Sequence, residues 1–257
     1  MLVFPLHEVG PMPRHRGKGV LVAFEGIDGA GKTTQANLLV SALLQADEPV
    51  TASKEPTTGD WGLRIRRSAA AGRLRPMEEL KYFLRDREQH TQNLIRPALS
   101  KGNTVILDRY YYSTIAYQGA RGFSVNDLKE MMEERFLVPD AVFLLDIDPA
   151  ISLQRIAKRG DVPNEFERLQ NLEKTRRVFL SLKDKRIILI NAAMPIDCVH
   201  KEVLQKFIDG PLKHRRCAKS NGCEDHKRHP MASTCPWVRS AAKLRETLSS
   251  DCIGAEG

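Results

Sequence analysis

Residues Gly26 to Thr33 have the composition of a phosphate-binding loop, with two glycines separated by four residues and followed by Lys and Thr. The glycines allow the turn to curl until its backbone N–H groups face a polyphosphate, and the positive end of a following helix adds to the attraction. Lys32 would then reach the outer phosphates, and the Thr33 hydroxyl would hold Mg²⁺. We expect this nucleoside triphosphate site to comprise Gly26, Ile27, Asp28, Gly29, Ala30, Gly31, Lys32, Thr33 and Thr34.

Two further groups of residues have the chemistry to bind a second substrate that is planar and anionic. Phe83 and Arg87 are four residues apart and share one helix face, where a ring and a planar donor can hold a base. Arg87 falls among apolar positions, where an unpaired charge is costly, and this favours a binding role. Arg109 follows an expected strand end at Asp108; its guanidinium suits a monophosphate, and Asp108 suits Mg²⁺ or its waters. The alternatives are that Phe83 is ordinary core and that Asp108 only pairs with Arg109.

The elements that must position these residues follow from the alternation of apolar runs with helical patterns between residues 20 and 208. Uninterrupted apolar strands separated by helices are typical of a parallel sheet covered on both faces, with its ligand beyond the carboxyl ends of the strands. We therefore expect an α/β fold: a phosphate-loop parallel β-sheet of about five strands with helices on both faces, a lid and a Cys/His-rich C-terminal tail. The expected strands are 19–24, 50–53, 104–107, 141–146 and 187–190, and the expected helices are 33–45, 77–100, 124–136, 149–158, 165–182 and 196–208.

Four segments, in this order, resemble sequences of the thymidylate kinase family. Phe24 to Gln35 is similar to the family's phosphate loop, and Lys54-Glu55-Pro56-Thr57 is similar to its Arg-Glu-Pro turn. Asp86-Arg87-Glu88-Gln89-His90 resembles its Asp-Arg-x-x-His helix segment, and Asp108-Arg109-Tyr110 with Ser113 and Ala116-Tyr117-Gln118-Gly119 resembles its most diagnostic stretch. The resemblance covers about residues 19–208. It implies a dTMP kinase of dTTP biosynthesis, which converts ATP–Mg²⁺ and dTMP to ADP and dTDP.

The resemblance also implies roles for individual residues. It assigns Arg109 to the acceptor phosphate, Asp28 to the acceptor sugar hydroxyl and the metal, and Tyr117 to the space that a ribose 2′-OH would need. Ser113 and Gln118 resemble contacts to the base edge and the phosphate, although both residue types also suit a polar helix surface. The implied dTMP site is Glu55, Phe83, Arg87, Arg109, Ser113, Tyr117 and Gln118, and the implied catalytic residues are Lys32, Arg109, Arg159 and Asp28.

A cationic helix end leads into residues 160–163, which resemble the family's lid. One branch of the family places a catalytic arginine in the phosphate loop, but residues 29–30 are Gly and Ala here, so the lid must supply it. Arg159 is the first choice and Arg155, also expected at ATP, the second. The family's Asp-Arg-(Ile/Phe)-Glu is replaced by Asn-Glu-Phe-Glu at 164–167, which leaves the identity of this arginine open. No general base is required, because a nucleotide monophosphate is already ionised at neutral pH.

Composition and charge limit the class of protein. The chain of 257 residues is 42% hydrophobic and 28% charged, as in soluble globular proteins. Its apolar runs are far shorter than the roughly 20 residues of a membrane span, so we expect no membrane-spanning segment. The net charge of +8 lies mainly at the ends, with three basic and one acidic residue in 1–19 and nine basic and five acidic residues in 212–257. A nucleic-acid partner is therefore not expected for the body.

The cysteines and the composition divide the chain into three expected regions: a flexible leader at 1–19, the kinase domain at 20–210 and a basic Cys/His-rich tail at 211–257. Four of the five cysteines lie in the tail, which favours a reducing cytoplasm over a secreted disulfide scaffold. The tail offers a candidate Zn²⁺ site whose spacing fits no standard zinc finger, and the alternative is a basic tail with incidental cysteines. The candidate ligands are Cys217, Cys223, His226, His229 and Cys235.

Two alternative functions stay open from the residues alone. One is a related nucleotide or deoxynucleoside kinase with another acceptor. The other is a catalytically weakened ATP-binding protein that acts through a metal- or nucleic-acid-binding tail, which only the altered lid favours. The resemblance further implies a homodimer.

Overall fold

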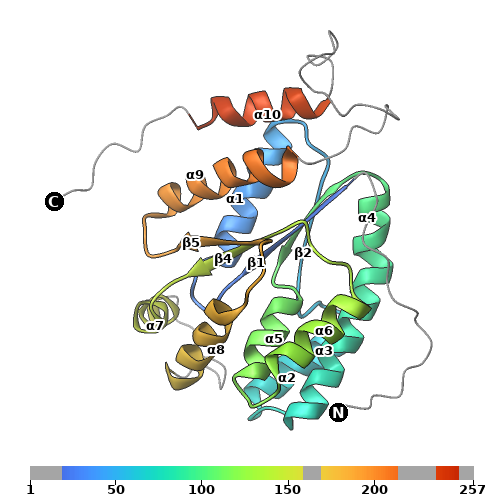
Figure 1. The fold of residues 1–257 in the computed structure, drawn as a ribbon, viewed down its shortest axis with the longest axis vertical. Coiled ribbons are helices and arrows are strands. Elements are labelled where there is room, and N and C mark those ends of the chain that lie inside the picture. The colour runs from blue at the N-terminus through green and yellow to red at the C-terminus, as the bar shows by residue number, and fades with distance from the viewer. Residues whose placement is uncertain (1–18, 159–168, 214–235, 249–257) are drawn as a thin grey trace, which may run out of the picture.

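The protein is described by a computed structural model that covers residues 19–158, 169–213 and 236–248. One sheet of five parallel strands runs through the molecule in the order β2-β3-β1-β4-β5 (Figure 1). Each strand begins and ends within one residue of its predicted range, and the predicted α/β fold is confirmed. The strands are β1 (Val20–Glu25), β2 (Val50–Lys54), β3 (Thr104–Asp108), β4 (Ala141–Asp146) and β5 (Ile187–Asn191).

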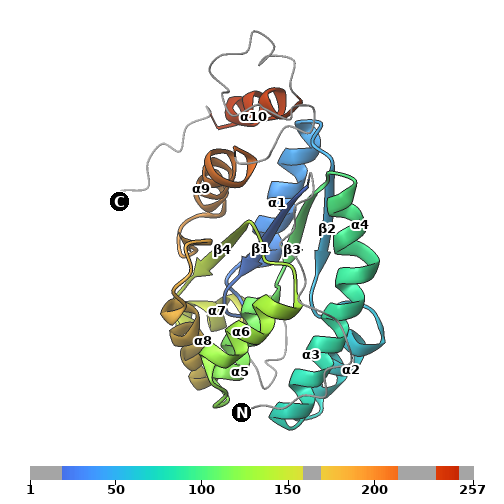
Figure 2. The ribbon, with the colours of Figure 1, turned by 45° about the vertical axis from the view of Figure 1, so that its right-hand side comes forward.

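Helices cover both faces of the sheet, as Figures 1 and 2 show. Helices α1 and α9 pack on one face of the sheet. The other face is covered by α3, α4, α5, α6 and α8. The helices are α1 (Lys32–Gln45), α2 (Asp60–Ala70), α3 (Pro76–His90), α4 (Arg96–Ser100), α5 (Tyr111–Gly119), α6 (Val125–Arg135), α7 (Pro149–Lys158), α8 (Leu169–Ser181), α9 (Ile196–Phe207) and α10 (Pro236–Glu246), with π-helical turns η1 (Thr91–Ile95) and η2 (Ile208–Leu212).

The central strand β1 is buried along its whole length and pairs with β3 and β4. Its residue Phe24 lies opposite Asp108 of β3, and Asp108 lies opposite Lys54 of β2. Because these strands are parallel and in register, the loops that leave β1, β2 and β3 start side by side at one edge of the sheet. These loops carry three of the four predicted motifs, and the fourth, Asp86 to His90, lies on α3.

The helix predicted at residues 77–100 is divided by a π-helical turn. Helix α3 ends at His90, η1 follows, and α4 completes the run to Ser100. Pro97 lies in the first turn of α4 and has no N–H to donate to the carbonyl four residues earlier. A wider turn just before such a residue accommodates the missing bond.

Three helices were not predicted, each for a physical reason. Helix α2 contains three arginines and a glycine, which are also common in a polar loop, and its apolar positions extend over only 11 residues. Helix α5 is buried at every position from Tyr111 to Gln118, so no polar face alternates with an apolar one. Helix α10 lies in the tail, beyond the point where the apolar pattern stops.

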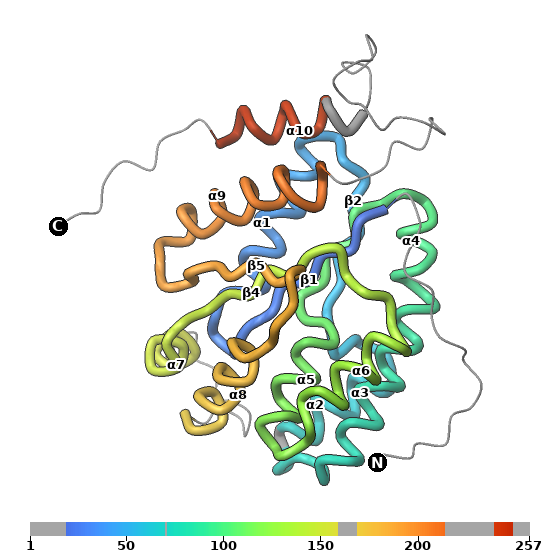
Figure 3. The backbone as a smooth tube through the Cα atoms, in the orientation of Figure 1, coloured from blue at the N-terminus to red at the C-terminus, as the bar shows by residue number. Residues whose placement is uncertain are grey.

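The C-terminal helix α10 packs on the far end of α1 and on η2 (Figure 3). Leu244 is fully buried there, and the Ser240 hydroxyl donates to the carbonyl of Ala46 (3.1 Å). The predicted boundary at residue 210 falls within η2. In the described part of the chain, no helix is long and apolar enough to cross a membrane. The predicted leader lies outside the described residues except for Gly19.

Candidate active site

The phosphate loop connects the carboxyl end of β1 to the first residue of α1. Gly26 and Gly29 have positive φ angles, and a Cβ at either would lie within 2.6 Å of a backbone oxygen, that of Leu145 or of Ser152. Gly31 also has a positive φ of 93°, but the space beside it is open. A left-handed backbone and close neighbours thus require glycine in the loop, and the open side at Gly31 is where a phosphate can approach the helix N-terminus.

Lys32 is 5% exposed, and its Nζ donates to the carbonyl of Ile27 within the same loop (2.6 Å). Burial and the nearby Arg109 lower the pKa of Lys32 to about 8. The ammonium group is held inside the loop, where an arriving phosphate would be close to it. The negative charge of such a phosphate would also stabilise the charged form of Lys32, which burial disfavours.

The side chains of Thr33 and Asp108 meet beside the loop, where the Thr33 hydroxyl donates to Oδ2 of Asp108. The second oxygen, Oδ1 of Asp108, is buried without a hydrogen-bond partner. A hydroxyl and a carboxylate oxygen are ligands that Mg²⁺ prefers, and Mg²⁺ at nucleotide sites takes few protein ligands because phosphates and waters supply the rest. The residues therefore fit Mg²⁺. Within the described residues no group of three or more His, Cys, Asp or Glu side chains could hold a metal.

A cavity of about 270 Å³ opens next to the loop. Seven residues of the predicted acceptor and catalytic sets line it, although they come from four separate segments of the chain: Asp28, Glu55, Phe83, Arg87, Arg109, Ser113 and Tyr117. Gln118 is different, because its amide donates to the buried carboxylate of Glu79 (2.7 Å) and it does not line this cavity.

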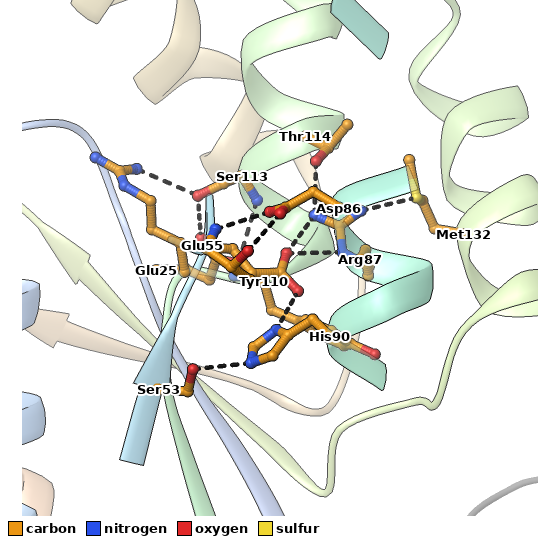
Figure 4. Close-up of polar contacts among 12 residues, drawn as sticks. Glu25, Ser53, Glu55, Asp86, Arg87, His90, Tyr110, Ser113, Thr114 and Met132 are labelled. Atoms are coloured by element: carbon orange, nitrogen blue, oxygen red, sulfur yellow. Dashed lines mark hydrogen bonds and ion pairs between the residues drawn. The ribbon is translucent and has the colours of Figure 1, made fainter. Parts of the chain in front are cut away.

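Glu55 and Arg87 form a buried ion pair at the base of the cavity (Figure 4). Arg87 Nε and Nη2 lie 2.8 and 2.7 Å from Oε2 of Glu55. Although burial alone would raise the pKa of Glu55, the Arg87 guanidinium and His90 lower it below its usual value. Nη2 of Arg87 also donates to the Thr114 hydroxyl (2.9 Å), and Nη1 contacts the sulfur of Met132 (3.4 Å). These partners leave one of the five guanidinium N–H groups of Arg87 for a ligand.

The Asp-Arg-x-x-His segment of α3 holds the turn after β2 in place. Asp86 accepts from the backbone N–H of Thr57 (2.8 Å) and from its hydroxyl. Nδ1 of His90 lies 3.0 Å from Oε1 of Glu55, and its Nε2 lies 2.8 Å from the Ser53 hydroxyl (Figure 4). The two motifs are 29 to 37 residues apart along the chain, but together they form one unit that fixes the orientation of Glu55 and hence of Arg87.

Arg109 lies between the cavity and the phosphate loop. Its backbone has a positive φ of 71°, which is uncommon for a non-glycine residue. Its guanidinium forms an ion pair with Asp28, whose other oxygen accepts from the Tyr117 hydroxyl (2.6 Å). Asp28 raises the pKa of Arg109 despite its burial, so Arg109 stays charged. A cation held at the mouth of the phosphate loop can face phosphates on both sides.

Several other predicted residues lie away from the cavity or outside the described part. Arg155 donates from Nη1 to the carbonyl of Ala192 after β5 (3.0 Å). Arg159 and the rest of the predicted lid at 160–168 lie outside the described residues, as do the tail ligands Cys217, Cys223, His226, His229 and Cys235.

Sequence reasoning did not single out three residues of the site. Arg66 of α2 lines the cavity and donates to the carbonyls of Pro56 and Thr57, which fixes the turn from its other side. Thr114 lines the cavity and binds Arg87. Glu25 is fully buried at the end of β1, where burial raises its pKa to about 7. Only Glu25 gave a signal in the sequence, as a charged residue at the end of an apolar strand.

Comparison with known proteins gives a consistent result. The thymidylate kinase family model matches residues 24–203. A thymidylate kinase of Xylella fastidiosa strain M12 is 51% identical over 173 residues, which is 66% of this chain and 79% of the relative. Thymidylate kinases of Xanthomonas oryzae pv. oryzae strain PXO99A and Xanthomonas campestris pv. campestris strain B100 are 46% and 47% identical over 185 residues, 72% of this chain and 81% of each relative. The predicted resemblance is confirmed, and the chain belongs to the thymidylate kinase family.

Proposed function

We propose that this chain transfers the γ-phosphoryl group of ATP to dTMP, giving ADP and dTDP, and that the cavity beside the phosphate loop holds dTMP. The observation that carries the proposal is the convergence of seven predicted residues from four segments on that one cavity. As a member of its family the chain is a dTMP kinase, and the assignments of individual residues below are our own.

The base of dTMP lies in the cavity between the ring of Phe83 and the guanidinium of Arg87. Phe83 supplies an aromatic face, and the N–H of Arg87 that has no protein partner supplies one donor to a base carbonyl. Glu55 and Thr114 hold the guanidinium, so little entropy is lost when the base binds. Tyr117 packs beside the sugar, where its ring and the Asp28 carboxylate that it binds leave no room for a 2′-hydroxyl.

The phosphate of dTMP binds Arg109, at the side of the cavity nearest the loop. Its attacking oxygen is already ionised near neutral pH, so the reaction needs positioning and charge neutralisation and no base. Arg109 and Lys32 approach the reacting groups from opposite sides. Together they neutralise charge that would keep two phosphates apart.

ATP binds with its outer phosphates in the loop between Gly26 and Thr34. Thr33 and Asp108 would hold Mg²⁺, which neutralises charge on the phosphates when it is bound. Arg159 is our choice for the lid cation that reaches the transferring group, and Arg155, fixed to Ala192 O, contributes at the nucleotide. A homodimer, a cytoplasmic location and zinc in the tail are further proposals, which size-exclusion chromatography, cell fractionation and metal analysis of the full chain would test.

The test is ADP release from ATP–Mg²⁺ with dTMP, dUMP, thymidine or no acceptor, measured in parallel on the full chain. We expect clear preference for dTMP. Turnover with thymidine alone would contradict the proposal, because it would require a base that deprotonates a hydroxyl. Absence of ADP release with every acceptor, from folded protein that still binds ATP, would also contradict the proposal.

A further inference from the structure

Glu25 is a fully buried carboxylate that the mechanism above does not use. It is the last residue of β1, directly before the first glycine of the phosphate loop. Oε1 of Glu25 accepts from the backbone N–H groups of Tyr110 (2.8 Å) and Ser113 (3.2 Å), and its Oε2 accepts from the Ser113 hydroxyl. Figure 4 shows Tyr110 and Ser113 at Glu25. Both belong to the segment that carries Arg109.

The contacts of Glu25 hold the backbone on the C-terminal side of Arg109. That residue has the left-handed φ of 71°, which L-residues rarely adopt without support from their surroundings. The N–H of Arg109 donates to the carbonyl of Phe24 (2.9 Å), and the next N–H, of Tyr110, donates to Glu25. Two consecutive residues at the end of β1 therefore hold two consecutive N–H groups immediately before α5. This arrangement determines where the side chain of Arg109 leaves the backbone.

The same carboxylate also reaches the guanidinium through one hydroxyl. The Ser113 hydroxyl donates its hydrogen to Glu25, so its oxygen is free to accept from Nη1 of Arg109 (3.3 Å). On the other side Asp28 binds Nη2. The guanidinium plane is thus held at both ends, by Asp28 directly and by Glu25 through Ser113.

We propose that Glu25 is a positioning residue that sets the orientation of Arg109 toward the acceptor phosphate, through the turn at Tyr110 and through the Ser113 hydroxyl. The proposal rests on the phosphate-binding role of Arg109 given above. Helix N-caps are usually Ser, Thr, Asp or Asn next to the helix in the chain, whereas Glu25 reaches α5 from β1 and also binds the Ser113 hydroxyl. Because Oε2 of Glu25 accepts the hydrogen of Ser113, that hydrogen points away from Arg109.

The substitution Glu25→Gln separates these roles with little change in shape. Its amide oxygen can still accept from the two backbone N–H groups. Its NH₂ group, however, donates to the Ser113 oxygen and so competes with Arg109 for that acceptor. The Ser113 hydroxyl also loses the carboxylate oxygen to which it donated. The control is Glu48→Gln, because Glu48 is a second buried glutamate that accepts from a hydroxyl (Thr104, 2.9 Å) at the opposite end of the sheet.

The experiment is a double-mutant cycle that combines Glu25→Gln with Arg109→Ala. The dissociation constant of dTMP is measured by calorimetry, and kcat/KM is measured for dTMP and for ATP. For Glu25→Gln alone we expect a loss of roughly 10- to 100-fold in kcat/KM for dTMP, the size expected for misplacement of a substrate contact, with KM for ATP within about twofold. In the Arg109→Ala background the same change should have less than about threefold effect. Glu48→Gln should leave all the kinetic values unchanged.

An equal loss from Glu25→Gln with and without Arg109 would overturn the positioning role, because Glu25 would then act on the fold alone. Unchanged dTMP binding in Arg109→Ala would instead overturn the phosphate role of Arg109, so the two failures are distinguishable. If Glu25→Gln does not fold, as judged by thermal melting, Ser113→Ala takes its place in the same cycle. It removes the hydroxyl between Glu25 and Arg109, and additivity in that cycle would equally overturn the proposal.

Discussion

At the carboxyl end of the sheet oppositely charged side chains form a buried ion pair, whereas at the amino end, where α10 packs on α1, the ion pair is exposed and an apolar side chain is buried. Arg87 and Glu55 have side chains 1% and 3% exposed in their ion pair at the cavity. Where α10 packs on α1, Leu244 is fully buried, while the ion pair of Lys243 with Asp47 has side chains 50% and 79% exposed.

The difference reflects what each end must do. A buried ion pair recovers its desolvation cost only through good geometry, and an apolar pair of the same size is often at least as stable. The carboxyl end keeps such pairs because a base and phosphates must find oriented donors there. The amino end binds no substrate in our proposal, so its contacts can serve stability alone. Substitutions at the carboxyl end should therefore cost activity, and those at the amino end should cost stability.

The largest expected effect is that of Lys32→Ala on turnover. Removal of this cation should lower kcat by about 10³-fold, because the ammonium group of Lys32 would no longer neutralise charge on the phosphoryl group that is transferred. Thermal stability should stay the same or rise, because the variant no longer has to bury a charge. Steady-state kinetics and a thermal melt on the same preparation would check both. Activity within tenfold of the parent would contradict the role of Lys32.

Glu55→Gln tests whether a residue at the carboxyl end can also affect stability. Breaking this buried pair leaves Arg87 without a counter-charge and should cost about 3 kcal/mol in the free energy of unfolding, with weaker dTMP binding. Because the folded pKa of Glu55 is below its usual 4.5, its contribution is present above that pH and lost as the pH falls through the folded pKa. Denaturant titrations should therefore show that the difference in free energy of unfolding between the parent and Glu55→Gln becomes smaller in acid. A difference that does not change with pH would contradict an origin in the charge of Glu55.

Leu244→Ala addresses the amino end. It should lower the free energy of unfolding by about 2–3 kcal/mol, as expected for truncating a buried leucine, with unchanged kcat and KM. The control is Leu44→Ala on α1, where the leucine is 59% exposed and its loss should have little effect. Equal effects from the two leucines, in denaturant melts, would show that α10 adds no stability. A change in KM would show that the two ends of the sheet are coupled.

The contrast between the two ends also explains which elements could be predicted from the sequence. The five strands and the phosphate loop were predictable because each depends on a local pattern, an apolar run or glycines at fixed spacing. Helix α5 was not, because residues that are buried all round have no period. Helix α10 was missed because it lies in a tail of basic composition. Its apolar side is identified only by its contacts with α1 and η2, which the sequence does not reveal.

The site divides in the same way. The position of Arg87 among apolar residues favoured a binding role, which stays a prediction. The structure also gives Arg87 a protein partner, Glu55, which is 32 residues away, and this pairing emerges only when α3 packs on the turn after β2. The assignment of Gln118 to the substrate came from the resemblance and stays a prediction, with its amide now bound to Glu79. Arg66 could not be found at all, because its function depends on two backbone carbonyls.

The pH dependence of ATP binding gives a smaller effect at the carboxyl end. With the pKa of Lys32 at about 8 in the free protein, roughly a tenth of it is charged at pH 9, and ATP affinity should fall by up to about tenfold between pH 7 and 9. ATP itself is fully ionised over the upper part of this range. Calorimetry at pH 8.5 in two buffers should therefore detect proton uptake on binding. Its absence would contradict the lowered pKa.

The smallest expected effect is that of Lys243→Ala, which removes the exposed ion pair with Asp47. Exposed pairs contribute about 0–1 kcal/mol, because water and salt screen them and two long side chains must be ordered. Lys243 is the better residue to change, since Asp47 has a positive φ of 56° and its substitution would also alter the backbone energy of the turn after α1.

Denaturant melts of Lys243→Ala at low and high salt should differ from the parent by less than about 0.5 kcal/mol at either salt concentration. The comparison with Glu55→Gln then contrasts a buried ion pair with an exposed one, because each substitution removes one charge of a pair. A loss from Lys243→Ala as large as that from Glu55→Gln would mean that the charges around α10, and not Leu244, hold the helix in place. The amino end would then rely on ion pairs as the carboxyl end does, and the contrast between the two ends would no longer hold.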